Sequence, residues 1–197
     1  MFAYFSSHKH IRDALLSVFF VLFLYILTNN EITHPTPTPA FGKWSIQKIQ
    51  YPLLLGLAGH NYLVLRDEKN NVVYELHGLA TDALTGIWKY VGASDTDKLV
   101  VWEFNGSRNY FSSNNDPGFV LTTGSKEDML MLWEKARTCK EKINEKKLLY
   151  PPLGVKVTGE TINSNSVAYT LIRCMGLNTR HLGIFTPGAK KDILNGE

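Results

Sequence analysis

Hydrophobic and polar residues alternate along several short stretches of the chain, and most of these stretches are followed by residues typical of turns. Alternation with a period of two places apolar side chains on one face of a β-strand. The turn-forming residues 67–71 separate two such stretches, so residues 60–66 and 72–76 are expected to form a β-hairpin. Further strands are expected at residues 44–51, 98–104 and 119–122.

Two later stretches carry apolar residues at helical spacing. The first helix is expected to begin at Ser125, with Asp128 three residues later as in a capping box. The second is expected to run from about Ser164 to Met175 and to stop at Gly176. The predicted fold class is therefore α+β, with a small antiparallel sheet packed against two main helices. The apolar set of the first helix is Met129, Leu132, Trp133, Ala136, Cys139 and Ile143, and that of the second is Val167, Ala168, Leu171 and Met175.

The N-terminal part of the chain has a different pattern. Residues 14–28 contain no charged side chain and follow Lys9 and Arg12. We expect residues 13–28 to be a transmembrane signal anchor, with a cleaved signal peptide as the competing interpretation. Residues 1–12 would then stay in the cytoplasm. The proline-rich residues 29–41 would form an extended linker, and residues 42–197 an extracytoplasmic domain.

Composition limits the partners that this domain is expected to have. The net charge is only +3, and the Lys and Arg residues are scattered rather than clustered. A basic stripe of the kind that binds nucleic acid is therefore absent from the sequence pattern. The expected partner is the lipid bilayer, through the N-terminal helix.

The two cysteines, Cys139 and Cys174, both fall within the helical patterns. The extracytoplasmic space permits a disulfide, but the sequence alone does not establish a bridge. Buried, unreactive thiols are the expected state, because free cysteine packs as a small hydrophobic residue.

A histidine and a serine suggest a catalytic pair. His60 begins a predicted strand, and Ser164 lies in the first turn of a predicted helix, on its apolar side. A serine hydroxyl needs a general base to act as a nucleophile, and free N–H groups at a helix start favour a developing anion. The competing interpretation is that Ser164 only caps its helix, as Asn163 or Thr161 also could.

The hairpin register decides whether His77 can orient His60. An even number of turn residues would place the two histidines on the same face of the sheet, whereas a five-residue turn would place them on opposite faces. A β-bulge would reverse either case. The same site includes Asn163, Asn165, Ser166 and Tyr62 as binding residues, although an aromatic such as Tyr62 also fits a core position. No metal-ligand spacing is present among the histidines, and no cofactor is expected.

These segments resemble the circularly permuted papain-like superfamily, which includes lecithin:retinol acyltransferase and permuted relatives of NlpC-type cell-wall peptidases. The matching segments are Gly59-His60, Glu75-Leu76-His77 and Asn163-Ser164-Asn165-Ser166-Val167, and Phe185-Thr186-Pro187-Gly188-Ala189 fits the same group. The resemblance covers roughly residues 44–178 in the order of the elements. Ser164 stands where the family has its catalytic cysteine, so either the serine acts in its place or only a binding pocket remains.

The resemblance implies acyl transfer, or hydrolysis of an amide or ester, on a lipid or cell-wall peptidoglycan substrate. Ser164 would be the nucleophile, His60 the base and His77 the orienting group. The alternatives are a non-catalytic, membrane-tethered binding or assembly module on the same fold, and a toxin-like effector domain.

Overall fold

The computed structural model describes residues 38, 42–53, 58–89, 91–106, 116–156, 158–180, 182 and 186–196. The chain divides into two units, Met1–Thr33 and His34–Glu197, and all of the described residues lie in the second. Their elements are β1 (Trp44–Leu53), β2 (Ala58–Arg66), β3 (Val72–Thr81), β4 (Trp88–Lys89), β5 (Lys98–Asn105), β6 (Gly118–Gly124), α2 (Lys126–Glu145), the 3-10 turn η3 (Pro152–Gly154) and α3 (Ser164–Cys174).

The strands form one antiparallel sheet in the order β4-β3-β2-β1-β6, with β5 also paired to β3. The predicted α+β class, with an antiparallel sheet and two helices, is confirmed. Strand β3 continues past the predicted end at Leu76 to Thr81, because β5 pairs with it along Tyr74 to Thr81. The short strand β4 was not predicted from the pattern, since two residues are too few to show a period.

One edge of β3 is shared between two neighbours. Strand β2 occupies this edge only as far as the Leu63–Leu76 pair, and β4 occupies it again at Ala80 and Thr81. Because β5 holds the opposite edge throughout, the edge of β3 from His77 to Leu79 has no neighbouring strand among the described residues. The start of α3 packs against this part of the sheet.

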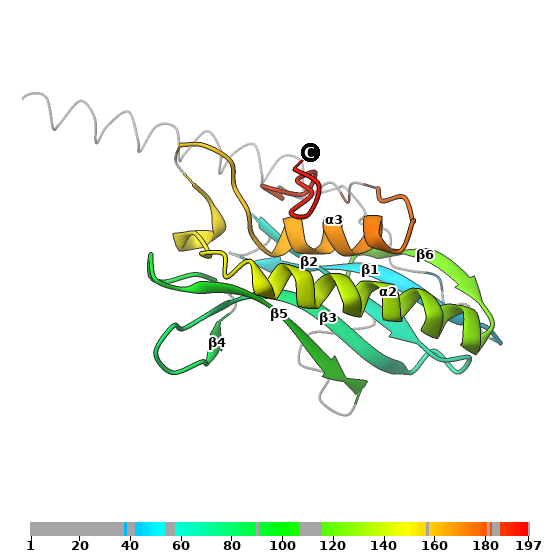
Figure 1. Ribbon diagram of the computed structural model, residues 1–197. Coiled ribbons are helices and arrows are strands. Elements are labelled where there is room, and N and C mark those ends of the chain that lie inside the picture. The colour runs from blue at the N-terminus through cyan, green and yellow to red at the C-terminus, as the bar shows by residue number, and fades with distance from the viewer. Residues whose placement is uncertain are drawn as a thin grey trace, which may run out of the picture. The chain divides into compact units, whose positions relative to one another are not determined.

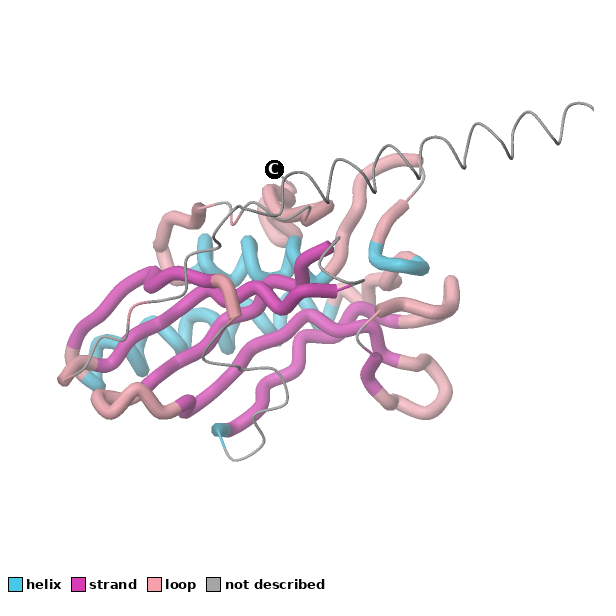
Figure 2. The backbone as a smooth tube through the Cα atoms, turned by 180° about the vertical axis from the view of Figure 1, so that it is seen from behind, coloured by secondary structure: helices cyan, strands magenta, loops and turns pink. Residues whose placement is uncertain are grey.

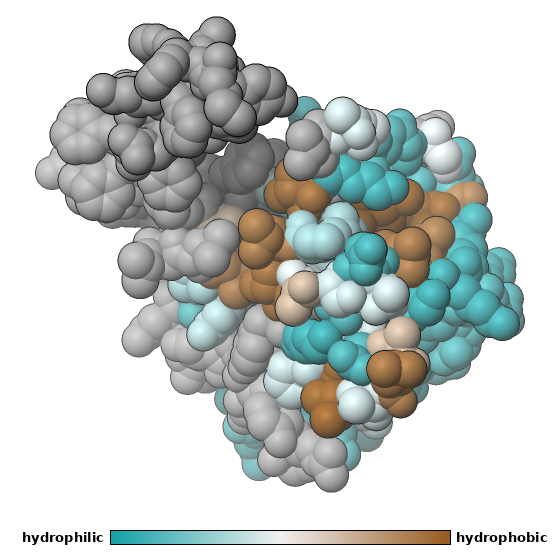
Figure 3. Space-filling model, turned by 90° about the vertical axis from the view of Figure 1, so that its left-hand side faces the viewer, coloured by the Kyte–Doolittle hydropathy of each residue, from teal (hydrophilic) through white to brown (hydrophobic). Residues whose placement is uncertain are grey.

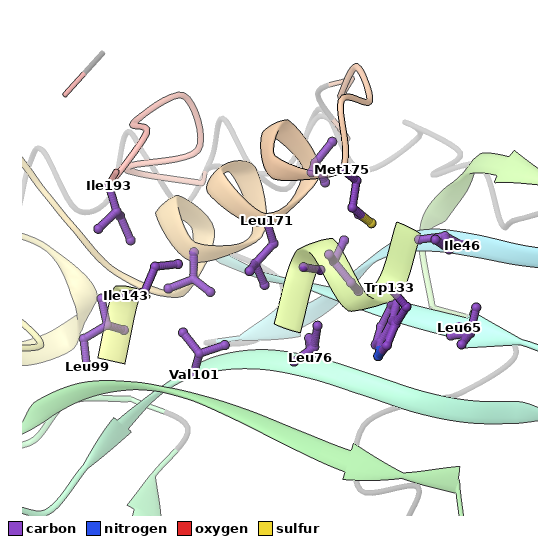
Figure 4. Close-up of a cluster of buried hydrophobic side chains, with 14 of the residues drawn as sticks. Ile46, Leu65, Leu76, Leu99, Val101, Trp133, Ile143, Leu171, Met175 and Ile193 are labelled. Atoms are coloured by element: carbon purple, nitrogen blue, oxygen red, sulfur yellow. The ribbon is translucent and has the colours of Figure 1, made fainter. Parts of the chain in front are cut away.

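Both α-helices of the described residues lie on the same face of the sheet (Figure 1), and the view from behind shows the strands in front of them (Figure 2). The main core fills the space between the sheet and the helices. Side chains of β1, β2, β3 and β5 meet those of α2 and α3 there (Figure 4). The fully buried Trp133 is the largest of them.

Helix α2 begins as the pattern predicts. Its N-cap is Ser125, whose hydroxyl accepts a hydrogen bond from the backbone N–H of Asp128 at 3.1 Å. Four of the six predicted inward residues are buried, namely Met129, Trp133, Ala136 and Ile143. The other two, Leu132 and Cys139, are partly buried and pack against the same core.

The expectation of free thiols is wrong. Cys139 of α2 and Cys174 of α3 form a disulfide, with their Cα atoms 6.5 Å apart. Two packed helices bring two cysteines within bonding distance, which the separate helical patterns do not reveal. The bridge ties the end of α3 to the middle of α2.

No helix among the described residues is long and apolar enough to cross a bilayer. The predicted anchor at residues 13–28 lies outside the described residues, as does the predicted linker apart from Thr38.

Candidate active site

Helix α3 begins with a capping box made by Asn163 and Ser166. The Asn163 side-chain oxygen accepts hydrogen bonds from the backbone N–H groups of Asn165 (2.8 Å) and Ser166 (3.4 Å). In return, the Ser166 hydroxyl accepts one from the backbone N–H of Asn163 at 3.3 Å. Ser164 is therefore the first residue of the helix, and its interpretation as the cap is wrong. Its hydroxyl is not used to close the helix end.

The three polar residues around Ser164 also hold neighbouring loops in place. The side-chain amides of Asn163 and Asn165 and the hydroxyl of Ser166 donate hydrogen bonds of 2.7–3.2 Å to backbone carbonyls. The carbonyls belong to Gly154, Pro187 and Gly188. The residues expected to bind a substrate thus fix the start of α3 against η3 and the C-terminal segment.

His60 and His77 lie on the same face of the sheet because of a β-bulge. Next to the turn, Arg66 pairs with Val72, which is the register of a five-residue turn. The register then shifts between Arg66 and Leu65. Without this shift the two histidines would point to opposite faces. The bulge is the condition that allows His77 to reach His60.

The two histidines and Glu75 form a chain of hydrogen bonds. Nε2 of His60 lies 3.1 Å from Nδ1 of His77, and Nε2 of His77 lies 3.2 Å from the Glu75 carboxylate. All three side chains are buried, with at most 2% of the surface of each residue exposed. Burial lowers the pKa of both imidazoles, and electrostatic repulsion between the two rings on protonation lowers the pKa of His60 further. Both rings are therefore neutral at pH 7.

Tyr62 is a core residue beside this chain. It is fully buried and its ring stacks on that of His77, with the ring centroids 4.3 Å apart. Its hydroxyl lies 3.5 Å from the Asp116 carboxylate, and burial, with Asp116 as the next cause, raises its pKa. Tyr62 thus fixes the His77 ring by packing.

The first turn of α3 meets the sheet at the residues that directly follow the two histidines. The backbone N–H of Asn61 donates a hydrogen bond of 2.9 Å to the side-chain oxygen of Asn165. A β-carbon on Gly78 would lie 3.1 Å from Cα of Ser164 and 2.6 Å from a methyl carbon of Val167. The helix start therefore packs closely on Gly78 from the core face of the sheet, where only a glycine leaves room for it. The His60 and His77 side chains lie on the other face, with Tyr62 and Phe104.

Tyr150 is the hydrogen-bond partner of Ser164. The two hydroxyl oxygens are 3.5 Å apart, and the phenol oxygen also accepts from the backbone N–H of Ser164. Burial raises the pKa of Tyr150, so the phenol is neutral and keeps its proton. In the part of the chain that the structure describes, no hydrogen bond joins Ser164 to either histidine. Ser164 and Tyr150 are each 3% exposed.

Two residues of this site were not identified from the sequence. Glu75 precedes His77 by two positions, so the period of a strand places both on one face, and this signal was available. Tyr150 lies in a loop after α2, and nothing in the local pattern links it to Ser164. Its place follows from the packing of two distant segments.

The described residues contain no group of three or more His, Cys, Asp or Glu side chains that could hold a metal ion. Comparisons of the chain with protein-family models, with curated proteins and with solved structures gave no match. The interpretation of the site therefore depends on its geometry and its chemistry.

Proposed function

We propose that the domain is a membrane-anchored, papain-like hydrolase or acyltransferase that cleaves an ester or amide through an acyl-enzyme on Ser164. His60 is the general base, and His77 orients it. The N-terminal anchor, residues 13–28, holds the domain at the outer surface of the membrane.

The observation that carries this proposal is the meeting of three segments. Asn61 and Gly78, which follow the two histidines, contact the first turn of α3 through the Asn165 side chain and the Ser164 backbone. The order and position of these segments are those on which the family resemblance depends. A role for Ser164 beyond capping also agrees with Asn163 being the cap.

The proposed reaction begins when Oγ of Ser164 attacks the carbonyl carbon of the substrate and its proton passes to Nδ1 of His60. His60 then gives this proton to the leaving amine or alcohol as the carbon–leaving-group bond breaks. Water or a second substrate accepts the acyl group by the same steps in reverse.

The sequence led us to expect that free N–H groups in the first turn of α3 would hold the oxyanion, but two of these groups are already hydrogen-bonded. The N–H groups of Asn165 and Ser166 are occupied by the Asn163 side chain. The neutral phenol of Tyr150 lies 3.5 Å from the Ser164 hydroxyl, and its O–H can turn from this hydroxyl to the substrate. We assign the oxyanion to this donor.

Exposed apolar residues favour a lipid substrate over a peptidoglycan one. Leu153 and Val155 are 72% and 41% exposed, and they flank Gly154, whose carbonyl binds Asn163 at the start of α3. Leu84 and Ile87, 97% and 64% exposed, lie in the turn before β4. The face of the molecule toward β4 and η3 shows several apolar areas between polar ones (Figure 3). Such residues suit contact with acyl chains.

A fluorophosphonate probe tests the nucleophile. We expect the probe to label the wild-type domain and to spare Ser164→Ala and His60→Ala, because the first lacks the hydroxyl and the second lacks the base. Ser125→Ala, which removes the serine at the start of the other helix, serves as the control and is expected to label as the wild type does. Circular dichroism would verify that each variant is folded. Equal labelling of all four proteins would remove Ser164 from the proposal.

A non-catalytic binding module is the second candidate, and one observation favours it. Ser164, His60 and His77 are almost completely buried, so a substrate reaches the hydroxyl only after a local opening. On this account the polar residues at the start of α3 serve only the fold. Absence of labelling in the wild type, together with specific binding of the folded domain to vesicles, would support the module.

A further inference from the structure

We propose that Glu75 fixes the direction of the hydrogen bonds in the chain Glu75–His77–His60, and so keeps Nδ1 of His60 free of a proton. Glu75 is in this account a positioning residue that acts through His77. The tautomer of His60 is a property of the fold alone, whereas its consequence for catalysis rests on the function proposed above.

The chemistry of the Glu75 carboxylate determines which atom is the donor in each of these hydrogen bonds. An ionised carboxylate only accepts hydrogen bonds, so Nε2 of His77, 3.2 Å away, must carry a proton and donate it to the contact. A neutral imidazole has one protonated nitrogen, so Nδ1 of His77 is then an acceptor. Nε2 of His60, 3.1 Å from this atom, must be the donor. Nδ1 of His60 is left with a lone pair, which is what a general base needs.

The rings cannot easily turn to escape this arrangement. The rings of His60 and His77 are parallel within 8°, and Tyr62 stacks on His77 at 4.3 Å between centroids. Phe104 of β5 meets His77 edge-on at 5.6 Å. Rotation of either ring would break both the packing and the hydrogen bonds.

Charged and titratable groups on two strands surround Glu75. From β2, the Arg66 guanidinium and the Tyr62 phenol face it, and Asp116 lies beyond that phenol. From β3 itself, His77 faces it. The partner of Glu75 on β5 is the uncharged Phe104. Arg66 is the cation that favours the ionised carboxylate, and Gln47 holds its Nε at 3.0 Å.

Protonation of Glu75 would reverse the direction of the hydrogen bonds that join Glu75, His77 and His60. Burial raises the pKa of Glu75 to about 7, against the opposing effect of Arg66. Below this pH the carboxylic acid donates to Nε2 of His77, so Nδ1 of His77 donates to His60 and Nδ1 of His60 becomes the protonated atom. The base-competent tautomer is therefore favoured above about pH 7 and lost as the pH falls through this value.

Nuclear magnetic resonance of the histidine side chains tests this directly. In long-range ¹H–¹⁵N spectra at pH 8, we expect both His60 and His77 of the wild type to be protonated at Nε2. The Glu75→Met variant should lose this preference at His60, whereas Glu103→Met, which removes an ion-paired carboxylate on β5, should retain it. A wild type with the proton of His60 on Nδ1 at pH 8, or an unchanged tautomer in Glu75→Met, would overturn the proposal.

The pH dependence of probe labelling is a second test. It uses a variant that keeps the size and packing of the Glu75 side chain. With a single controlling group near pH 7, probe labelling of the wild type should fall about tenfold from pH 8 to pH 6. Glu75→Gln, which does not titrate, should remove this step. A step that persists in Glu75→Gln would contradict the proposal. If no labelling occurs at any pH but the tautomers behave as expected, the proposed function fails and the inference on Glu75 stands.

Discussion

Replacing Gly78 with alanine is expected to lower the free energy of unfolding by about 3 kcal/mol, the upper part of the range for overpacked sites. The added β-carbon would lie 2.6–2.7 Å from two carbon atoms of Val167 and 3.1 Å from Cα of Ser164. A branched side chain and a helix backbone cannot move aside as a flexible chain end can. The first turn of α3 must therefore shift away from β3, and probe labelling of Ser164 should be lost as well. Urea unfolding measures the change in stability.

Two further variants show whether the loss of stability in Gly78→Ala comes from its contact with Val167 and Ser164. Gly124→Ala is the matched control, because its β-carbon would lie 3.0 Å from the flexible methyl end of Met129, and we expect a cost below about 1 kcal/mol. In Gly78→Ala with Val167→Ala, the combined cost should be smaller than the sum of the single costs by about 1 kcal/mol. Equal losses of unfolding free energy in Gly78→Ala and Gly124→Ala would contradict the close contact of α3 with β3. Strict additivity of the losses in Gly78→Ala and Val167→Ala would contradict it as well.

Removal of the disulfide is expected to have an effect of similar size. The bridge joins positions 35 residues apart, and closing a loop of this length stabilises a fold by about 4 kcal/mol through the lost entropy of the unfolded chain. The double variant Cys139→Ala with Cys174→Ala should therefore unfold at a clearly lower urea concentration than the wild type.

The control for this prediction is the wild type with and without a reducing agent. Reduction should reproduce most of the loss of stability seen in the double variant, and it should leave the double variant itself unchanged. A double variant that is as stable as the oxidised wild type would show that helices α2 and α3 do not need the bridge.

The elements with a strong period were predicted well from the sequence. The alternation before and after residues 67–71 gave the hairpin, and Ser125 was identified as a helix start and proved to be the cap of α2. The inward side of the second helix, including Ser164, is buried as its spacing indicates. These features are local, and burial of one face determines them.

The features that depend on three-dimensional packing were not predicted. Whether His60 and His77 share a face depends on one bulge, and a bulge leaves no reliable mark in the hydrophobic pattern. The contact of Tyr150 with Ser164 and the bridge between Cys139 and Cys174 each join separate segments. The partners are 14 and 35 residues apart in the sequence, so no local period connects them.

The capping of α3 shows how two local signals can compete. Asn163 and Ser164 are both good cap residues, and the sequence pattern did not separate them. Asn163 is the cap because its amide also reaches the carbonyls of Gly154 and Pro187, contacts that a serine hydroxyl is too short to make together. The serine is thereby placed one residue further along, beside Gly78.

If His60 activates the side chain at position 164, a single thiol placed there should react unusually fast. Both native cysteines are bridged, so Ser164→Cys introduces the only free thiol among the described residues. We expect iodoacetamide to alkylate this thiol at pH 7 at least about tenfold faster than the thiol of Ser164→Cys with His60→Gln, because the imidazole that we propose as the base would promote the thiolate. Equal rates of alkylation in these two proteins, both folded, would show that His60 does not activate position 164.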